Sequence, residues 1–165
     1  MAENVTVNIR DIASSLPDNW LIGCDRSEFL LKVDRLFEEL TKNPAETPHK
    51  ILLAEREPVQ FLASFIATCA AKCHIFLCNP NWVKSEWQQV FDLVHPDIII
   101  GQDALQNRTE MQFIASPLEK PKNNLQLPLI MIPTGGSSGK IRFTIHNWET
   151  LTASVTGFQQ YFQVA

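Results

Sequence analysis

One short segment of the sequence concentrates residue types that bind anions. Between Pro133 and Arg142 the chain carries three glycines, three hydroxyl side chains and two cations in ten residues. Glycines let the backbone turn so that several N–H groups point into one concavity, and hydroxyl groups add further donors. Lys140 and Arg142 supply positive charge. This composition predicts a cradle for the phosphates of a nucleotide.

Two common phosphate-binding patterns do not fit this segment. A Walker A loop requires the pattern G-x4-G-K-[ST], but Thr134 and Ile141 stand at its first and last positions here. The dinucleotide pattern G-x-G-x-x-G also fails, and the residues that follow have the pattern of a strand rather than a helix. A flexible connection is the simpler interpretation, but flexible linkers join domains, whereas this loop directly follows a buried strand pattern.

The rest of the chain alternates strand patterns with helix patterns. We predict nearly all-apolar strands at 50–54, 75–78, 97–101, 129–132 and 142–145. We predict helices at 26–42, from Pro58 to about Cys73, at 85–93 and from Asn147 onward. This alternation predicts an α/β fold with a mostly parallel sheet and helices on both faces. Ligands of such sheets bind beyond the carboxyl ends of the strands, where the glycine-rich loop is expected.

Helix ends and loops complete this expectation. Asp25 and Ser85 are predicted N-caps because Glu28 and Gln88 follow three residues later, the spacing of a capping box. Pro58 fits the first turn of its helix. The polar segment 102–126 is predicted to be a long surface connection with one edge strand near 113–115. The last helix places four apolar residues on one face, Leu151, Val155, Phe158 and Phe162.

Charge and composition exclude several classes of function. The 165 residues carry 14 Lys and Arg against 18 Asp and Glu, a formal net charge of −4, with no basic block. This argues against a nucleic-acid-binding surface. No apolar run approaches the ~20 residues of a membrane span, and the N-terminal segment lacks the pattern of a secretory signal. We therefore expect a cytoplasmic protein of one domain's length.

The cysteines raise the question of a zinc site. Cys69, Cys73, His74 and Cys78 lie within ten residues, but without the C-x2-C pair that is typical of zinc ligands. In the other interpretation, Cys69 and Cys73 share a helix face and Cys78 ends a strand. Buried free cysteine packs like a small apolar side chain. We therefore predict packing and no metal site.

Residues 131–142 resemble the phosphate-loop signature of the adenylate-forming (AMP-binding) enzymes, the group of acyl-CoA synthetases and luciferases. That signature is an apolar residue, two free positions, then Thr/Ser, Ser/Gly, Gly, Ser/Thr, Thr/Ser, Gly, a free position, usually Pro, and Lys. Ile141 replaces the usual Pro and Arg142 the usual Lys. Both departures are mild. The resemblance covers most of the chain and is strongest at 127–162.

Within this family, residues 135–143 and 145–151 resemble the o-succinylbenzoate–CoA ligases of phylloquinone and menaquinone biosynthesis, as do residues 78–82. The resemblance implies an AMP-forming acid–CoA ligase that uses ATP, Mg²⁺ and coenzyme A, with o-succinylbenzoate as the acid. It also implies which residues hold the β- and γ-phosphates: Thr134, Gly135, Gly136, Ser137, Ser138, Gly139 and Lys140.

Enzymes of this family are several hundred residues long, and their adenine and ribose motifs, magnesium-binding acid and catalytic lysine come later in the chain. We therefore expect residues 1–165 to be the N-terminal α/β subdomain of the large domain, ending after the phosphate loop. We expect it to be inactive alone, with the catalytic residues beyond 165, and to self-associate through exposed apolar surface.

Two other functions remain open. The chain could be a stand-alone, non-catalytic module that binds nucleotide or phosphate, or a structural interaction domain whose glycine-rich loop is only a connection. A complete module should bind a nucleotide well by itself, whereas part of a ligase should not.

Overall fold

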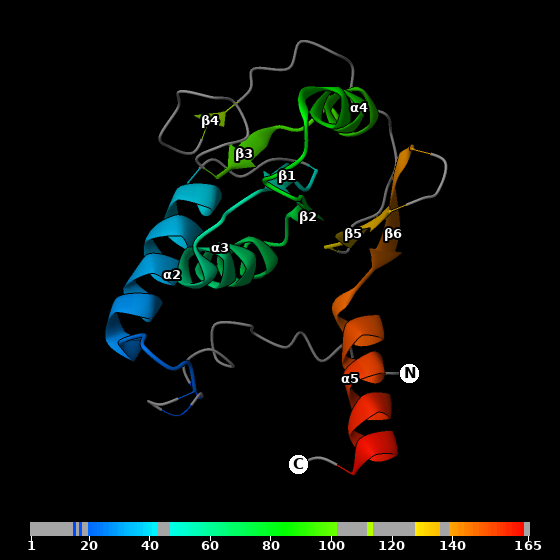
Figure 1. Cartoon of the computed structure of the whole chain (residues 1–165). Helices are drawn as coiled ribbons and strands as arrows, with labels where there is room; N and C mark the ends of the chain where they lie inside the picture. Colours follow the sequence, from blue (N-terminus) through cyan, green and yellow to red (C-terminus); the bar gives the residue numbers. More distant parts are fainter. Residues whose placement is uncertain are drawn as a thin grey trace.

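The computed structural model describes residues 15, 17, 20–42, 47–101, 112–113, 128–135 and 139–163. Its strands are β1 (Lys50–Leu53), β2 (His74–Leu77), β3 (Ile98–Ile100), β4 (Gln112–Phe113), β5 (Ile130–Gly135) and β6 (Ile141–His146). Its helices are α2 (Arg26–Thr41), α3 (Pro58–Ala70), α4 (Lys84–Val94) and α5 (Trp148–Phe162). The strands form one six-stranded sheet in the order β4-β3-β1-β2-β5-β6 (Figure 1).

The centre of the sheet is parallel. Strand β1 pairs in parallel with β2 and β3, and β2 pairs in parallel with β5. The strands at the two edges, β4 and β6, run antiparallel to their neighbours. Strands buried on both faces need apolar side chains throughout, which explains the runs of isoleucine and leucine in β1 and β3. The predicted α/β fold with a mostly parallel sheet is confirmed.

Helices cover both faces of the sheet (Figure 1). Helix α3 connects β1 to β2, and α4 connects β2 to β3 in the opposite direction across the sheet. Crossovers between parallel strands are right-handed in nearly all proteins, so two crossovers in opposite directions place their helices on opposite faces. Ile51 and Leu53 accordingly share a cluster with Cys69 of α3, whereas Leu52 packs with Val90 of α4. The predicted two-sided covering is confirmed.

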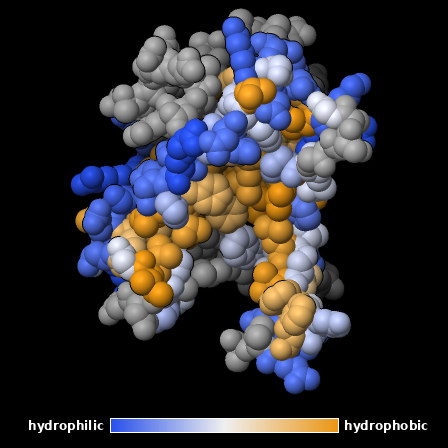
Figure 2. All heavy atoms as spheres, viewed as in Figure 1, coloured by the Kyte–Doolittle hydropathy of each residue, from blue (hydrophilic) through white to orange (hydrophobic). Residues whose placement is uncertain are grey.

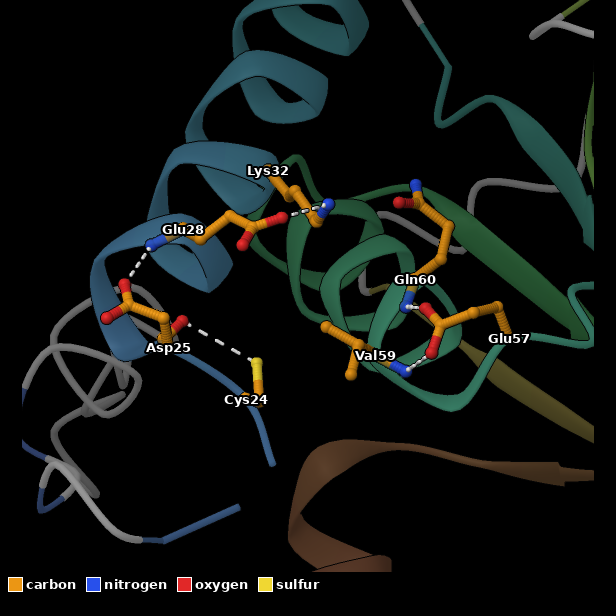
Figure 3. Close-up of polar contacts among 7 residues, drawn as sticks. All are labelled: Cys24, Asp25, Glu28, Lys32, Glu57, Val59 and Gln60. Carbon is orange, nitrogen blue, oxygen red and sulfur yellow. Dashed lines mark hydrogen bonds and ion pairs between the residues drawn. The ribbon is translucent and has the colours of Figure 1, made fainter. Parts of the chain in front are cut away.

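Helices α2 and α3 begin at carboxylate caps (Figure 3). The Glu28 amide donates to Oδ1 of Asp25 at 2.9 Å, which confirms the predicted N-cap. The Glu28 carboxylate forms an ion pair with Lys32 at 2.9 Å. Figure 3 therefore shows a single N-cap hydrogen bond at Asp25, and not the two reciprocal bonds of a capping box. In α3, Glu57 caps the helix by accepting from the amides of Val59 and Gln60, at 3.1 and 2.6 Å.

Two predicted helix ends are wrong. Ser85 is not an N-cap: α4 begins at Lys84 after Val83, because the Glu86 carboxylate reaches back to the Val83 amide at 2.8 Å. Helix α3 does not extend to Cys73. It ends at Ala70, because the next turn takes Lys72 into the left-handed region at φ 56° and redirects the chain into β2.

The polar segment before β5 lies almost entirely outside the described residues. Only Gln112 and Phe113 are described, and they form β4, antiparallel to β3 at the sheet edge. This agrees with the predicted edge strand at Phe113, whereas residues 114–115 are outside the described part. Within the described ranges, no helix has the length and apolar character needed to cross a membrane.

His74 ties β2 to the start of β5. The Leu129 amide donates to Nδ1 of the half-buried His74 side chain at 3.3 Å, immediately before the parallel pairing of β2 with β5. Burial lowers the pKa of His74 from its ordinary value of 6.5, and the Lys50 ammonium lowers it further. The imidazole is therefore held neutral, with Nδ1 as an acceptor.

We expect stability to fall as the pH drops below about 6.5. The pKa of His74 is lower in the folded than in the unfolded chain, so the unfolded chain binds more protons in this range and stability rises with pH. Protonation of Nδ1 also breaks the hydrogen bond from the Leu129 amide, which lowers the free energy of unfolding by about 1 kcal/mol more. Urea unfolding at pH 5 and pH 7.5 measures it. His74→Asn keeps an acceptor without titrating and should flatten the difference; an equally steep profile in that variant would contradict this assignment.

Candidate functional site

The glycine-rich loop closes the hairpin of β5 and β6. The last pair of the hairpin joins Gly135 to Ile141, so the loop proper spans residues 136–140. Sequence analysis placed Thr134 and Gly135 in the loop, but both belong to β5, which extends past the predicted end at residue 132. The pairing with β6 causes this extension. The loop still follows the carboxyl end of a parallel strand, as predicted.

The structure places four of the seven predicted phosphate-binding residues. Thr134 and Gly135 end β5, while Gly139 and Lys140 lead into β6. Gly136, Ser137 and Ser138 lie outside the described residues. Gly139 has a φ of +66°, a left-handed conformation in which a side chain would be strained. The backbone conformation therefore favours glycine at position 139.

Thr134 and Arg142 face one another across the hairpin. They form a cross-strand pair, and the Thr134 hydroxyl donates to the Arg142 carbonyl at 3.4 Å. Both side chains are exposed. An anion at the loop could receive the Thr134 hydroxyl hydrogen only if this long bond were released.

Two cations lie where the loop enters β6. Lys140 and Arg142 are exposed, and neither forms an ion pair with any residue in the described part of the chain. Ile141 lies between them and packs with the cluster that contains Trp87 and Val90 of α4. Because side chains alternate along extended backbone, burial of Ile141 leaves its two charged neighbours on the opposite side. Both are therefore available to an anion.

A glutamine of α4 holds the backbone on either side of Lys140. Nε2 of Gln89 donates to the Gly139 carbonyl at 3.4 Å, and Oε1 accepts from the Ile141 amide at 3.2 Å. Sequence analysis did not identify Gln89, because these partners lie 50 and 52 residues further along the chain. No local pattern signals such a contact.

A second polar group lies at the carboxyl edge of the sheet. Arg56, after β1, donates to the side chain of Asn81 and, at 3.2 Å, to the Pro80 carbonyl in the loop after β2. The Asn79 side chain accepts from the Asn81 amide at 2.9 Å and shapes the same turn. The sequence did not predict a role for Arg56 either, because its pattern there is that of an ordinary surface charge. Its contacts hold together the loops that follow β1 and β2.

The cysteines form no common centre. Cys69 and Cys73 lie on the α3 side of the sheet and Cys78 on the α4 side. Burial raises the pKa of Cys69 to about 12, of Cys73 to about 11 and of Cys78 to about 12, so all three remain thiols at neutral pH. In the described ranges, no three His, Cys, Asp or Glu side chains gather as metal ligands. Cys73 lies beyond the end of α3 and not on its face.

No family model and no curated protein matches this sequence. Function is therefore inferred from the residues of the β5–β6 hairpin and the elements that hold it.

Proposed function

We propose that this chain is the N-terminal part of an ATP-dependent acid–CoA ligase of the adenylate-forming kind, and that its β5–β6 loop holds the β- and γ-phosphates of ATP. One observation carries the proposal: a loop rich in glycine and serine follows a parallel strand of an α/β sheet and is followed by two exposed cations, Lys140 and Arg142, that form no ion pair among the described residues. The resemblance of residues 131–142 to the phosphate-loop signature supports it.

In this proposal the loop acts on the first of two half-reactions. A carboxylate oxygen of the acid attacks the α-phosphorus of ATP, the bond to the β-phosphate bridging oxygen breaks, and pyrophosphate leaves with its charge. The sulfur of coenzyme A then attacks the acyl carbon and AMP leaves. Loop amides and Lys140 position the leaving group and stabilise its charge. Magnesium bound together with ATP would share that charge.

The remaining assignments are part of the same proposal. The acid is o-succinylbenzoate, and the pathway is phylloquinone or menaquinone biosynthesis in the cytoplasm. The adenine pocket and the catalytic residues belong to segments beyond residue 165, so the 165-residue chain alone does not form the thioester.

A titration of the chain with two ligands tests this function. In NMR spectra, inorganic pyrophosphate should shift the backbone amide resonances of residues 134–142. ATP should bind no more tightly than pyrophosphate, because in this proposal the adenine pocket belongs to later segments. Lys140→Met should weaken pyrophosphate binding about 10–100-fold, since a hydrogen bond to a charged group contributes about 1.5–3 kcal/mol. Lys42→Met, which changes an exposed lysine at the end of α2, is the matched control.

The other functions give different results in this titration. A stand-alone nucleotide-binding module would bind ATP far more tightly than pyrophosphate. A loop that is only a connection would bind neither ligand. Either result would contradict the proposal.

The proposed ligase part should also associate with itself through α5. None of the residues of α5 is buried, and Val155, Phe158, Tyr161 and Phe162 are exposed by 57 to 80%. Figure 2 shows apolar atoms along this helix, which projects from the rest of the described structure. Only Glu149 is charged, so little repulsion opposes pairing.

We expect the sedimentation mass to rise with concentration. Phe158→Ser removes a ring that packs at a tilt against Phe162, with centroids 4.5 Å apart, and should return the chain toward the monomer. Gln160→Ser, at an exposed position on another side of the same helix, is the control and should change nothing. A sharp monomer at high concentration in the unmodified chain would contradict self-association.

A further inference from the structure

Gln89 makes a two-point contact with the loop. Its amide nitrogen donates to the Gly139 carbonyl and its amide oxygen accepts from the Ile141 amide, at 3.4 and 3.2 Å. We propose that Gln89 is the positioning residue of the phosphate loop and sets the backbone on which Lys140 is presented. This inference rests on the proposed function of the loop.

The helix that carries Gln89 is firmly held. Its neighbours Trp87 and Val90 are buried against the sheet. The same apolar cluster takes in Ile141 and Phe143 of β6, and Phe143 lies edge-on against Phe76 of β2 at 5.3 Å. The side chain of Gln89 therefore links the loop to a surface that packing has already fixed.

The chemistry of the contact favours an amide. The side chain meets one backbone acceptor and one backbone donor, two residues apart, as a neighbouring strand would. Only a side chain with both a donor and an acceptor can bond to both backbone groups. The two bonds also define the orientation of the Gln89 amide, with the nitrogen toward Gly139 and the oxygen toward Ile141. Methionine has nearly the same length as glutamine, but it has no hydrogen-bond donor and only a weak acceptor.

The contact fixes the residue that bears the charge. Lys140 lies between the two bonded backbone groups, and its own side chain is exposed. Gly139 is in a left-handed conformation, and apart from its chain neighbours no described residue has an atom within 4 Å of where a Cβ would stand. The Gln89 bonds hold the loop where it enters β6. An ordered backbone spares an anion the cost of ordering it on binding.

Amide exchange and pyrophosphate binding, measured on the ¹⁵N-labelled 165-residue chain, test this role. In Gln89→Met, exchange at the Ile141 amide should accelerate about tenfold and the Kd for inorganic pyrophosphate should rise about tenfold. Exchange in β1 should stay unchanged, which shows that the fold is intact. Gln88→Met is the matched control, because Gln88 is exposed and its side chain bonds to Asp92, one turn along α4.

The unmodified chain gives a second measurement. The side-chain amide resonances of Gln89 should shift as pyrophosphate is added, whereas those of Gln88 should not.

Each other outcome overturns the role in an identifiable way. Unchanged exchange at Ile141 in Gln89→Met would show that the contact does not hold the loop. Faster exchange with unchanged pyrophosphate affinity would remove the positioning role and leave the proposed function in place. If the unmodified chain binds no pyrophosphate, the proposed function fails, and the positioning role fails with it.

Discussion

Gly101→Ala should destabilise the protein by about 3–5 kcal/mol, the largest effect of a single methyl group that the described structure predicts. Gly101 follows β3 with a φ of +132°, a conformation that L side chains rarely adopt. An added Cβ would stand 2.4 Å from the Ala54 carbonyl oxygen and 2.6 Å from its carbonyl carbon. Both atoms are backbone, so no side chain can turn away to relieve the clash.

The strands themselves would have to separate in this variant. The Ala54 amide donates to the Ile100 carbonyl at 2.8 Å, which holds the ends of β1 and β3 together at this point. Urea unfolding measures the loss. Gly157→Ala is the control: it lies in α5 with open space around it, and should stabilise by about 1 kcal/mol. Equal effects from both substitutions would contradict the predicted clash.

Gly136→Val should abolish adenylation in the proposed full-length ligase while sparing the fold. Gly136 follows the last pair of the hairpin, at the start of the loop, where the proposed function brings backbone and phosphate into close approach. A branched side chain there would block that approach and resist a positive φ. We expect the rate of ATP–pyrophosphate exchange to fall at least 10²–10³-fold, the range found when one stabilising donor is lost.

Thermal unfolding separates this effect from a folding defect. The melting temperature of Gly136→Val should match that of the parent, because the hairpin strands keep their pairing with one another and β5 with β2. Substantial exchange activity in a normally folded variant would exclude a phosphate path at this position.

Local patterns predicted much of this fold, and the reasons are visible in particular residues. Asp25 caps α2 through an amide only three residues away, so the sequence spacing contains the whole interaction. The apolar runs of β1 and β3 follow from burial on both faces of the sheet. The glycine- and serine-rich composition of the loop is likewise visible in adjacent residues, while its binding of an anion stays a prediction.

Interactions between distant segments were not predictable in this way. Pro133 read as the start of a loop, but it lies inside β5 because the pairing of β5 with β2 ends at Met131, leaving only β6 beside it. A proline is tolerated where no neighbouring strand needs its N–H. Gln89 and Arg56 gain their roles from partners that the topology brings close, across 24 to 52 residues.

The central claim, that the loop is a pyrophosphate cradle, is tested most directly by measuring both half-reactions of Ser137→Ala in the proposed full-length ligase. Ser27→Ala, which changes an exposed serine in the first turn of α2, is the control. Loss of one charge-assisted donor, about 1.5–3 kcal/mol, should slow adenylation about 10–100-fold. Thioester formation from preformed acyl adenylate should continue at nearly the parent rate, because pyrophosphate has already left. An equal fall in both half-reactions, at unchanged thermal stability, would contradict the assignment of this loop.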